Sequence, residues 1–347
     1  MSSTDEFLVG PVIGHGGFAH VVYAVHKHSQ RKVAIKVIEQ VSLRKHPWLL
    51  QAVMTEKRIL QSSTRNDDNE TETLQSQYMV ELWAAFYDAQ QMYLVMELCT
   101  GGDLEGLLHQ VGLVDGGDKG RRIPAEDATL RSWFELSVPY YASQLVEAVN
   151  FLHTEKSILH CDLKPGNCLL DALTGRLKLA DFASAIEMNA LNQTLVPRGT
   201  SEYSSLELIR SVSPSSLTVA VDYWSVGCIL YAMTQAGKSP FARESESLAV
   251  QAVAEYCKEE GPSSLPAASP REEQCQEWLM FSTQLLQPQP GDRLRAWKDE
   301  ILNSEALKQG NPADLSLIEL PTPTWQRKVE STTLKDGNIG WSAFHAF

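Results

Sequence analysis

The sequence predicts an α+β protein, with a small β-rich N-terminal part and a larger helical C-terminal part. Its 347 residues and 43% hydrophobic content suffice for one large domain or for two smaller lobes. Residues 7–38 and 79–98 alternate in the manner of strands, whereas helical patterns dominate after residue 120. This order, strands first and helices later, indicates two parts of different class.

The N-terminal part is expected to contain several strands and one helix. A glycine cluster interrupts the strand-like residues 7–38, and Val33–Ile38 is rich in β-branched residues. Pro47–Leu60 places apolar residues at helical spacing. Two further strands are predicted in residues 79–98, around a turn at Asp88–Gln91.

The C-terminal part is expected to be mainly helical, most clearly at Tyr140–His153 and Asp222–Met233. Pro262–Pro270 is predicted to be a loop, and the last forty or so residues are expected to be extended because they contain several prolines. Polar stretches at 61–77 and 112–120 are predicted surface loops. An acidic docking segment is the alternative for the first of them.

Charge and cysteine usage exclude several classes of protein. The chain carries 30 Lys and Arg against 43 Asp and Glu residues, a formal charge of −13, so no nucleic-acid partner is expected. The six cysteines form no C-x-x-C pair, which favours reduced thiols over a zinc site or disulfides. We find no secretory signal and no apolar stretch of the roughly 18 residues that a membrane helix needs. We expect a cytoplasmic protein, with entry into the nucleus as an alternative left open.

Two features of the N-terminal part favour phosphate binding. Gly14, Gly16 and Gly17, followed by Phe18, lack side chains, so their backbone N–H groups can approach a polyphosphate closely. A glycine-rich hairpin without a ligand is the alternative.

The second feature is a lysine in a strand of the buried type. Lys36 needs an anionic partner there, because burying an unpaired ammonium group is costly. Glu56, in the following predicted helix, can supply that partner. A purely structural ion pair is the alternative.

The segment His160–Asn167 is the strongest signal for chemistry. It sets a carboxylate (Asp162), an ammonium group (Lys164) and an amide (Asn167) on one short loop. Such groups can accept a hydroxyl proton, neutralise a transferring phosphate and bind a metal. Asp181 follows a strand-like segment and adds a second carboxylate for a hard cation.

Together these motifs resemble the eukaryotic protein kinases over roughly residues 7–310. Asp222–Gly227 resembles the central helix of the family's large lobe, and Arg293 resembles the arginine that pairs with a glutamate of the activation segment, here Glu207. The resemblance implies a bilobal kinase-like fold. Its expected parts are an N-lobe at 1–98, a C-lobe at 99–309 and a C-terminal extension at 310–347.

The resemblance also implies roles for individual residues. Lys36 would hold the α- and β-phosphates of ATP and pair with Glu56, Asp162 would accept the substrate hydroxyl proton, and Lys164 would steady the γ-phosphate. The implied Mg²⁺ ligands are Asn167 and Asp181. The implied nucleotide-site residues are Gly14, Gly16, Gly17, Phe18, Val21, Ala34, Lys36, Met96, Glu97, Cys99, Asp103 and Leu169. Plain core packing is the alternative for the apolar positions among them.

Lys164, in the sequence Asp-Leu-Lys-Pro, resembles the serine/threonine branch, so the expected partner is a protein substrate with a Ser or Thr acceptor. The alternative is a pseudokinase that acts as a nucleotide-binding scaffold or allosteric regulator. The departures from the family pattern remove no charged catalytic group; they are Ala19, Cys161, Ala183 and Leu206.

Cys161 stands where related kinases carry an arginine that grips a phosphate on the activation segment. The segment also lacks a Ser or Thr three residues before Gly199, where that phosphate is carried. We therefore expect activity that does not require phosphorylation at that position. Thr194 is the nearest alternative site.

Arg293–Leu307 resembles the AGC group of kinases, and Gly199–Phe241 most resembles the 3-phosphoinositide-dependent type. The terminal Phe344 and Phe347 resemble the hydrophobic motif with which AGC kinases dock their tail on the small lobe. A loose tail is the alternative.

Two further positions bear on substrate choice. Gly166 and Ala232 occupy places where cyclic-nucleotide-dependent relatives carry glutamate. They predict no strong preference for arginine near the target residue.

Overall fold

The computed structural model describes residues 4–61, 77–110, 137–189, 201–211, 213–235, 239–258, 275–309, 323–332 and 335–336, with Gly237, Gly261 and Leu265. The chain forms two compact units, residues 1–101 with 322–347 and residues 102–321. The first is β-rich and the second mainly helical, as expected. In the described part of the chain, no helix is long and apolar enough to cross a bilayer.

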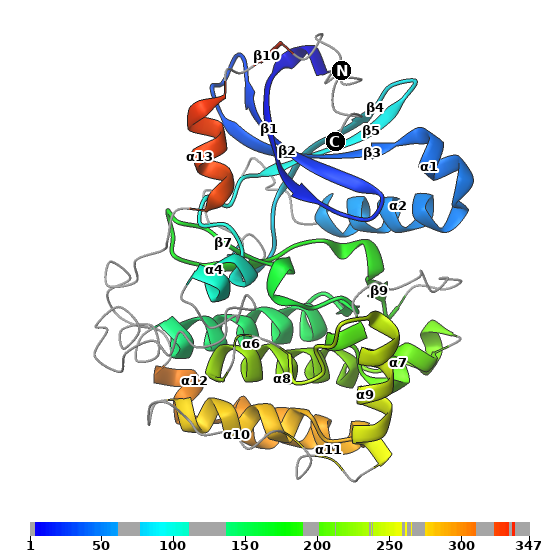
Figure 1. Cartoon of the computed structure of the whole chain (residues 1–347), viewed down its shortest axis with the longest axis vertical. Helices are drawn as coiled ribbons and strands as arrows, with labels where there is room; N and C mark the ends of the chain where they lie inside the picture. The colour runs from blue at the N-terminus through cyan, green and yellow to red at the C-terminus, as the bar shows by residue number, and fades with distance from the viewer. Residues whose placement is uncertain are drawn as a thin grey trace. The chain divides into compact units, whose positions relative to one another are not determined.

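The first unit is built on a six-stranded antiparallel sheet with the order β10-β1-β2-β3-β5-β4 (Figure 1). Its strands are β1 (Phe7–His15), β2 (Ala19–His26), β3 (Lys32–Glu39), β4 (Leu82–Tyr87), β5 (Gln91–Glu97) and β10 (Lys335–Asp336). Its helices are α1 (Gln40–Lys45), α2 (Pro47–Gln61) and α13 (Thr324–Ser331). The strands predicted at 7–38 and 79–98 and the helix from Pro47 are confirmed.

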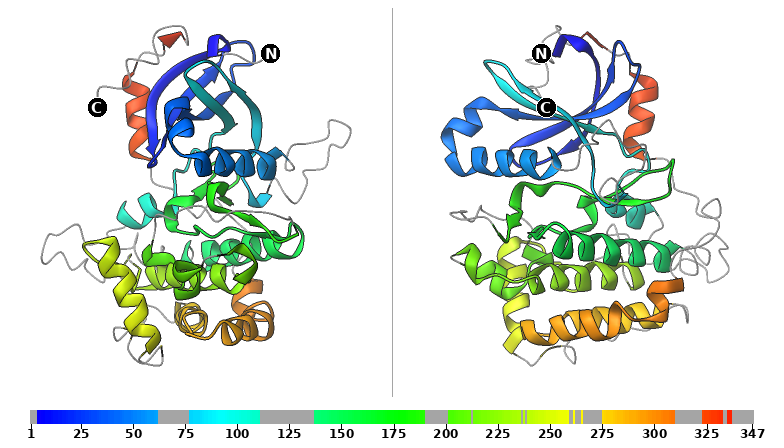
Figure 2. Two further views of the ribbon diagram at one scale, coloured as in Figure 1. Left: turned by 90° about the vertical axis from the view of Figure 1, so that its right-hand side faces the viewer. Right: turned by 180° about the vertical axis from the view of Figure 1, so that it is seen from behind.

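Strand β3 lies inside the sheet and is buried on both faces. Val33, Ile35 and Val37 belong to one apolar cluster with residues of β1, β2 and β5. Because side chains alternate along a strand, Ala34 and Lys36 point to the opposite face. Helix α2 lies on that face (Figures 1 and 2), so the sheet presents Lys36 to the helix.

The expectation of an extended C-terminal segment is wrong for Thr324–Ser331, which forms α13. Pro323 directly precedes this helix with φ of −58°, a backbone angle that suits a helix start, so this proline begins a helix and does not break one. The Trp325 ring stacks on Tyr23 of β2, with the ring centroids 6.4 Å apart. Strand β10 then pairs with Leu8 and Val9 of β1.

The second unit consists of stacked helices and short strands. In Figures 1 and 2, α6, α8 and α10 lie in successive layers. The helices are α4 (Leu104–Gln110), α6 (Val138–Thr154), α7 (Leu206–Arg210), α8 (Ala220–Thr234), α9 (Glu246–Lys258), α10 (Gln276–Leu285), α11 (Pro290–Arg295) and α12 (Glu305–Gln309), with a π-helical turn at Ala296–Ile301. The paired short strands are β6 (Ile158–Leu159) with β9 (Ile186–Glu187), and β7 (Cys168–Leu170) with β8 (Leu177–Leu179).

Helix α8 is the centre of the second unit. All of its residues are buried, which explains why the sequence Ala220–Thr234 is apolar on every side. The predicted helices Asp222–Met233 and Tyr140–His153 lie within α8 and α6 and are confirmed.

Several sequence predictions fall outside the described residues. They concern most of the loop predicted at 61–77, whose end residues Gln61 and Gln77 are helical, the loop at 112–120, most of Pro262–Pro270, Thr194, Phe344 and Phe347. The six cysteines are described; none of them forms a disulfide with another described residue, and burial raises the pKa of Cys168 and Cys228.

A buried guanidinium group ties α11 to α7 and to the start of α8. Arg293 is 0% exposed. Its Nε donates to the Ala220 carbonyl at 3.1 Å, its Nη1 donates to the Gln287 carbonyl at 2.6 Å, and its Nη2 pairs with Glu207. The ion pair between Arg293 and Glu207 expected from the sequence is therefore present.

Replacing Arg293 with alanine is expected to lower the free energy of unfolding by about 3–5 kcal/mol, because Glu207 and buried carbonyl groups lose their donors. Urea titration followed by circular dichroism measures this loss. The matched control is Arg295→Ala on the same helix, whose exposed pair with Asp292 contributes at most about 1 kcal/mol. Equal losses in the two variants would contradict the assigned role of Arg293.

Candidate active site

Lys36 and Glu56 form a close ion pair within the first unit. Lys36 Nζ lies 2.8 Å from Glu56 Oε1 and 2.7 Å from Oε2. The Glu56 side chain is only 1% exposed, so its carboxylate depends on this ammonium group for charge compensation. The pair predicted from the sequence is confirmed, and it leaves Lys36 fixed on the face of β3 that α2 covers.

The glycine loop is the turn between β1 and β2. Gly14 pairs with Val21 across the hairpin, and the Gly16 N–H donates to the Ala19 carbonyl at 2.8 Å. A Cβ atom added at Gly14 or Gly16 would meet no described atom closer than 3.5 Å, and one at Gly17 would meet nothing within 4 Å. Packing in the described chain therefore does not require glycine here, which favours close approach of a ligand over the purely structural alternative.

The other nucleotide-site residues predicted in the first unit lie on the neighbouring strands. Val21 is on β2, and Ala34 on β3 pairs with Met96 on β5. Glu97 ends β5, with its carboxylate accepting a hydrogen bond from a neighbouring backbone N–H at 2.8 Å, and Cys99 follows it, buried. Val21 pairs with Lys36 itself, and the Ala34–Met96 pair lies two positions along the same strand.

In the second unit, Asp162, Lys164 and Asn167 meet on one loop between β6 and β7. Lys164 Nζ lies 3.0 Å from Asp162 Oδ2. Asn167 Nδ2 donates to the Asp162 carbonyl at 2.7 Å and to Oδ2 at 3.2 Å. One Asp162 oxygen thus receives both an ammonium and an amide donor.

The carboxylate of Asp222 on α8 holds the start of this loop. It accepts the backbone N–H of His160 at 2.8 Å and of Cys161 at 2.9 Å, and the His153 ring lies 2.8 Å away. Burial alone would raise the pKa of Asp222, but the hydrogen bonds from His153 and His160 hold this pKa below its usual value. Cys161 adopts a left-handed φ of 62°, a costly conformation that these bonds maintain.

Asp181 follows β8 and is positioned through its neighbours. Its own φ is 60°, and the preceding Ala180 donates its N–H to the Asn167 carbonyl at 3.0 Å. The His160 ring contacts both the Ala180 carbonyl, at 3.1 Å, and the Phe182 ring, at 4.9 Å between centroids. The turn with Asp181 is therefore held against the loop with Asn167.

These donors fit a magnesium ion. Both hydrogen bonds of the Asn167 side chain use Nδ2, so in the described part of the chain its oxygen Oδ1 keeps its lone pairs for another partner. An amide oxygen and a carboxylate, as Asn167 and Asp181 supply, are types of oxygen ligand that hard cations prefer. Asp103 and Leu169 pair as an isolated bridge in the same unit, and Asp103 Oδ1 caps α4 by accepting the Gly106 N–H at 2.7 Å.

Comparison with known proteins accounts for the presence of a glycine loop, a lysine–glutamate pair and the polar loop of Asp162 in one chain. Residues 7–305 match the family model of the protein kinase domain. The chain belongs to this family. The kinase-like fold class and the serine/threonine type expected from the sequence are confirmed.

Relatives of this kinase domain include serine/threonine-protein kinase ULK3 of Xenopus laevis, 32% identical over 84% of this chain and 53% of that protein. Serine/threonine-protein kinase PKH2 of Saccharomyces cerevisiae is 30% identical over 72% of this chain and 21% of that protein. Serine/threonine-protein kinase ksg1 of Schizosaccharomyces pombe is 28% identical over 92% of this chain and 48% of that protein. The chain thus spans about half or less of the length of these relatives.

Cys161 is buried among apolar side chains of the kinase domain. It is 1% exposed and packs in a cluster with Leu159, Ile186, Leu208 and Val221. The cluster joins the loop of Asp162 to β9, α7 and α8 by apolar contact, where related kinases would place an arginine. Ala183 lies in a short 3₁₀ turn without positive φ, so alanine adds no backbone strain at this position.

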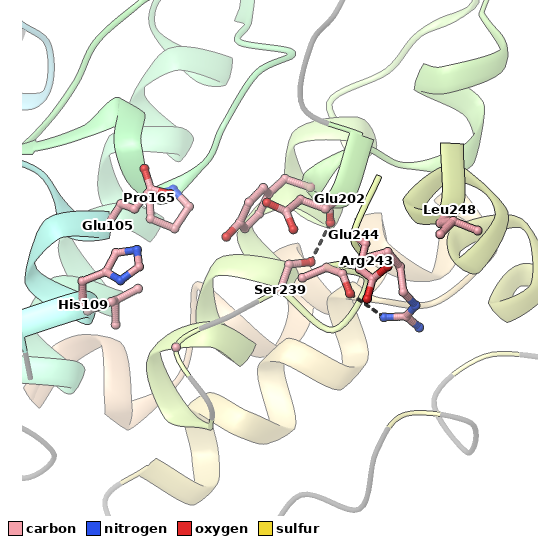
Figure 3. A pocket seen from close by; sticks show the side chains of 12 residues that line it. Glu105, His109, Pro165, Glu202, Ser239, Arg243, Glu244 and Leu248 are labelled. Carbon is pink, nitrogen blue, oxygen red and sulfur yellow. Dashed lines mark hydrogen bonds between the residues drawn. The ribbon is translucent and has the colours of Figure 1, made fainter. Parts of the chain in front are cut away.

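A cavity of about 660 Å³ adjoins the loop of Asp162 (Figure 3). Its lining includes Pro165 of that loop, three acidic residues and a cation; these are Glu105, Glu202, Glu244 and Arg243. A Cβ atom added at Gly166 would lie 2.9 Å from Glu105 Oε2, so this carboxylate occupies the space beside the glycine. Sequence reasoning missed Glu105, because nothing in the spacing links α4 to the catalytic loop.

The charge of Asp222 is expected to stabilise this kinase domain in a pH-dependent way. Because the folded-state pKa lies below the usual 3.8, the stabilisation is present above 3.8 and is lost as the pH falls through the lowered value. Asp222→Asn should lose about 3 kcal/mol of unfolding free energy near neutral pH, and the difference from wild type should shrink toward pH ~3. Urea titrations across this range measure both effects. The exposed Asp299→Asn is the control, and a pH-independent difference for Asp222→Asn would refute the assignment.

Proposed function

We propose that this kinase domain is an active enzyme that transfers the γ-phosphate of Mg·ATP to Ser or Thr hydroxyls of protein substrates, in intracellular signalling. The observation that carries the proposal is the presence of two assembled polar groups. One is the Lys36–Glu56 pair, and the other is the Asp162–Lys164–Asn167 loop. A domain that had lost catalysis would have no need to keep both.

Each group fits one task in the transfer. The Asp162 carboxylate, oriented by Lys164 and Asn167, is placed to orient the substrate hydroxyl and accept its proton. The ammonium group of Lys164 lies at the same carboxylate oxygen. Its positive charge would stabilise the negative charge of the phosphoryl group that is transferred to the substrate hydroxyl. Lys36, held by Glu56, would bind the α- and β-phosphates, and the glycine loop would offer backbone N–H groups.

The cofactors in this proposal are ATP and Mg²⁺. Bound Mg²⁺ would neutralise phosphate charge, and Asn167 and Asp181 would hold it. The proposed nucleotide-site residues are Gly14, Gly16, Gly17, Phe18, Val21, Ala34, Lys36, Met96, Glu97, Cys99, Asp103 and Leu169. The open space around the glycines and the uncommitted Asn167 oxygen support these assignments.

The finer assignments are also proposals. The motifs at Gly199–Phe241 and Arg293–Leu307 support an AGC-like enzyme of the 3-phosphoinositide-dependent type, and we propose a cytoplasmic location with nuclear access. Docking of Phe344 and Phe347 on the first unit is supported by β10, which pairs with β1 shortly before them. The alternative, a pseudokinase scaffold, is favoured by Cys161 alone, because Ala183 lies in a conformation open to alanine.

The decisive experiment compares wild type with Asp162→Asn in a phosphate-transfer assay with labelled ATP. The variant is expected to lose at least about 100-fold in transfer while it still binds Mg·ATP, because only the proton acceptor is removed. The matched control is Asp171→Asn, a carboxylate after β7 that bonds only its own turn. Equal background transfer by wild type and Asp162→Asn would favour the scaffold.

The apolar surroundings of Cys161 bear on the same assay. A thiol among these apolar side chains cannot take the place of a phosphate-binding arginine, so phosphatase treatment should leave wild-type transfer intact. Loss of transfer after that treatment would refute independence from phosphorylation.

The glutamates of this cavity refine the expectation of no strong arginine preference to a modest preference. We propose that Glu105 favours arginine or lysine near the acceptor, by about two- to fivefold in kcat/KM over alanine, as for a partly exposed ion pair. Paired peptides that differ at one position measure this ratio, and Glu105→Gln should bring it close to one. Glu155→Gln, an exposed control at the end of α6, should not change it. An unchanged ratio in Glu105→Gln would refute the role of Glu105.

A further inference from the structure

Three aromatic side chains meet at the tip of the glycine loop. The Phe18 ring contacts the His46 and Trp48 rings edge-on, with centroids 5.2 Å apart in both cases. The His46 and Trp48 rings are themselves 5.7 Å apart. The contact joins the turn after β1 to the corner between α1 and α2, which are distant in the sequence. Glycine-loop phosphate binding does not by itself require this contact.

The corner that receives Phe18 is rigid. His46 ends α1, with its N–H bonded to the Ser42 carbonyl at 3.0 Å, and its carbonyl accepts the Leu49 N–H at 2.9 Å. Pro47 lies between the two rings and begins α2; its ring fixes its own φ and restricts the backbone of His46. The sequence His-Pro-Trp therefore presents two aromatic rings in a fixed arrangement.

The loop has few other constraints. At the tip, the Gly16 N–H donates to the Ala19 carbonyl, and the strands below it pair at His15 with His20 and at Gly14 with Val21. A Cβ atom at Gly17 would touch nothing, so the glycines themselves do not anchor the loop by packing. Phe18 is 41% exposed, and its contacts with His46 and Trp48 are the means by which its ring is held.

We propose that Trp48 and His46 are positioning residues that hold Phe18, and with it the glycine loop, in place for the nucleotide. The inference rests on the proposed function, because it assumes that this loop covers ATP phosphates. A loop that is already ordered loses less conformational entropy when the nucleotide binds, so the contact should strengthen ATP binding. Aromatic pairs of this geometry account for a factor of about three to ten in an equilibrium constant.

The contact also links two parts of the phosphate site. Trp48 lies in the first turn of α2, and Glu56 lies about two turns further along the same helix. Movement of α2 would therefore displace Phe18 and the partner of Lys36 together. The glycine loop and the Lys36–Glu56 pair are thereby positioned by one helix.

The test uses the full chain with Trp48→Ala, the conservative Trp48→Phe, and Tyr87→Ala as the control. Tyr87 is an aromatic residue of the same unit that is 73% exposed and lies at the end of β4. Amide hydrogen exchange of residues 14–18 without nucleotide reports on the loop, and fluorescence titration with Mg·ATP reports on affinity. Steady-state kinetics separate KM for ATP from kcat.

Trp48→Ala is expected to speed amide exchange in the loop and to raise both the ATP dissociation constant and KM for ATP about three- to tenfold, with a smaller change in kcat. Trp48→Phe should keep most of the slow amide exchange in the loop and most of the affinity for ATP, and Tyr87→Ala should match wild type. Unchanged loop exchange in Trp48→Ala would overturn the contact, and faster exchange with unchanged ATP affinity would overturn its positioning role. If wild type itself bound no ATP, the proposed function would fall, and this role with it; the exchange data would still decide whether the contact holds the loop.

Discussion

The buried carboxylate of Asp222 is the constraint on which the second unit depends. A charge in the first turn of a fully buried apolar helix is tolerated only if its oxygens are fully hydrogen-bonded, and here the donors are the backbone of the catalytic loop and His153. The loop is therefore fixed at its first residues, including the left-handed Cys161, before any side chain of the active site contributes. The core of the unit therefore sets the backbone direction at Asp162, and Lys164 and Asn167 then orient its carboxylate.

The first unit meets a similar requirement in another way. Lys36 and Glu56 come from a strand and a helix that each bury their apolar faces, and each charge is compensated by the other. Neither unit builds its polar group on a free loop: one rests on β3 and α2, the other on α8. Rigid elements of this kind hold catalytic groups more closely than loops do.

Local patterns predicted much of this from the sequence. The strands β1 to β5, the helices α2, α6 and α8 and the Lys36–Glu56 pair follow from side-chain periodicity and from the cost of an unpaired buried charge. Glu105 beside Gly166 and Phe18 against Trp48 were not predictable, because they depend on how separate elements pack. Helix α13 departs from the extended chain that the prolines predict, because Pro323 directly precedes a helix and its φ suits a helix start.

The pairing of β10 with β1 affects more than the tail itself. An outer strand of a sheet offers a row of backbone donors and acceptors to which another molecule can add a strand. On β1, the chain's own strand β10 pairs with Leu8 and Val9. Beyond this pairing, Pro11 has no N–H to donate, and the register between β1 and β2 shifts between Val9 and Val12. The C-terminal strand and one proline together keep this edge from serving as a template for strands of other molecules.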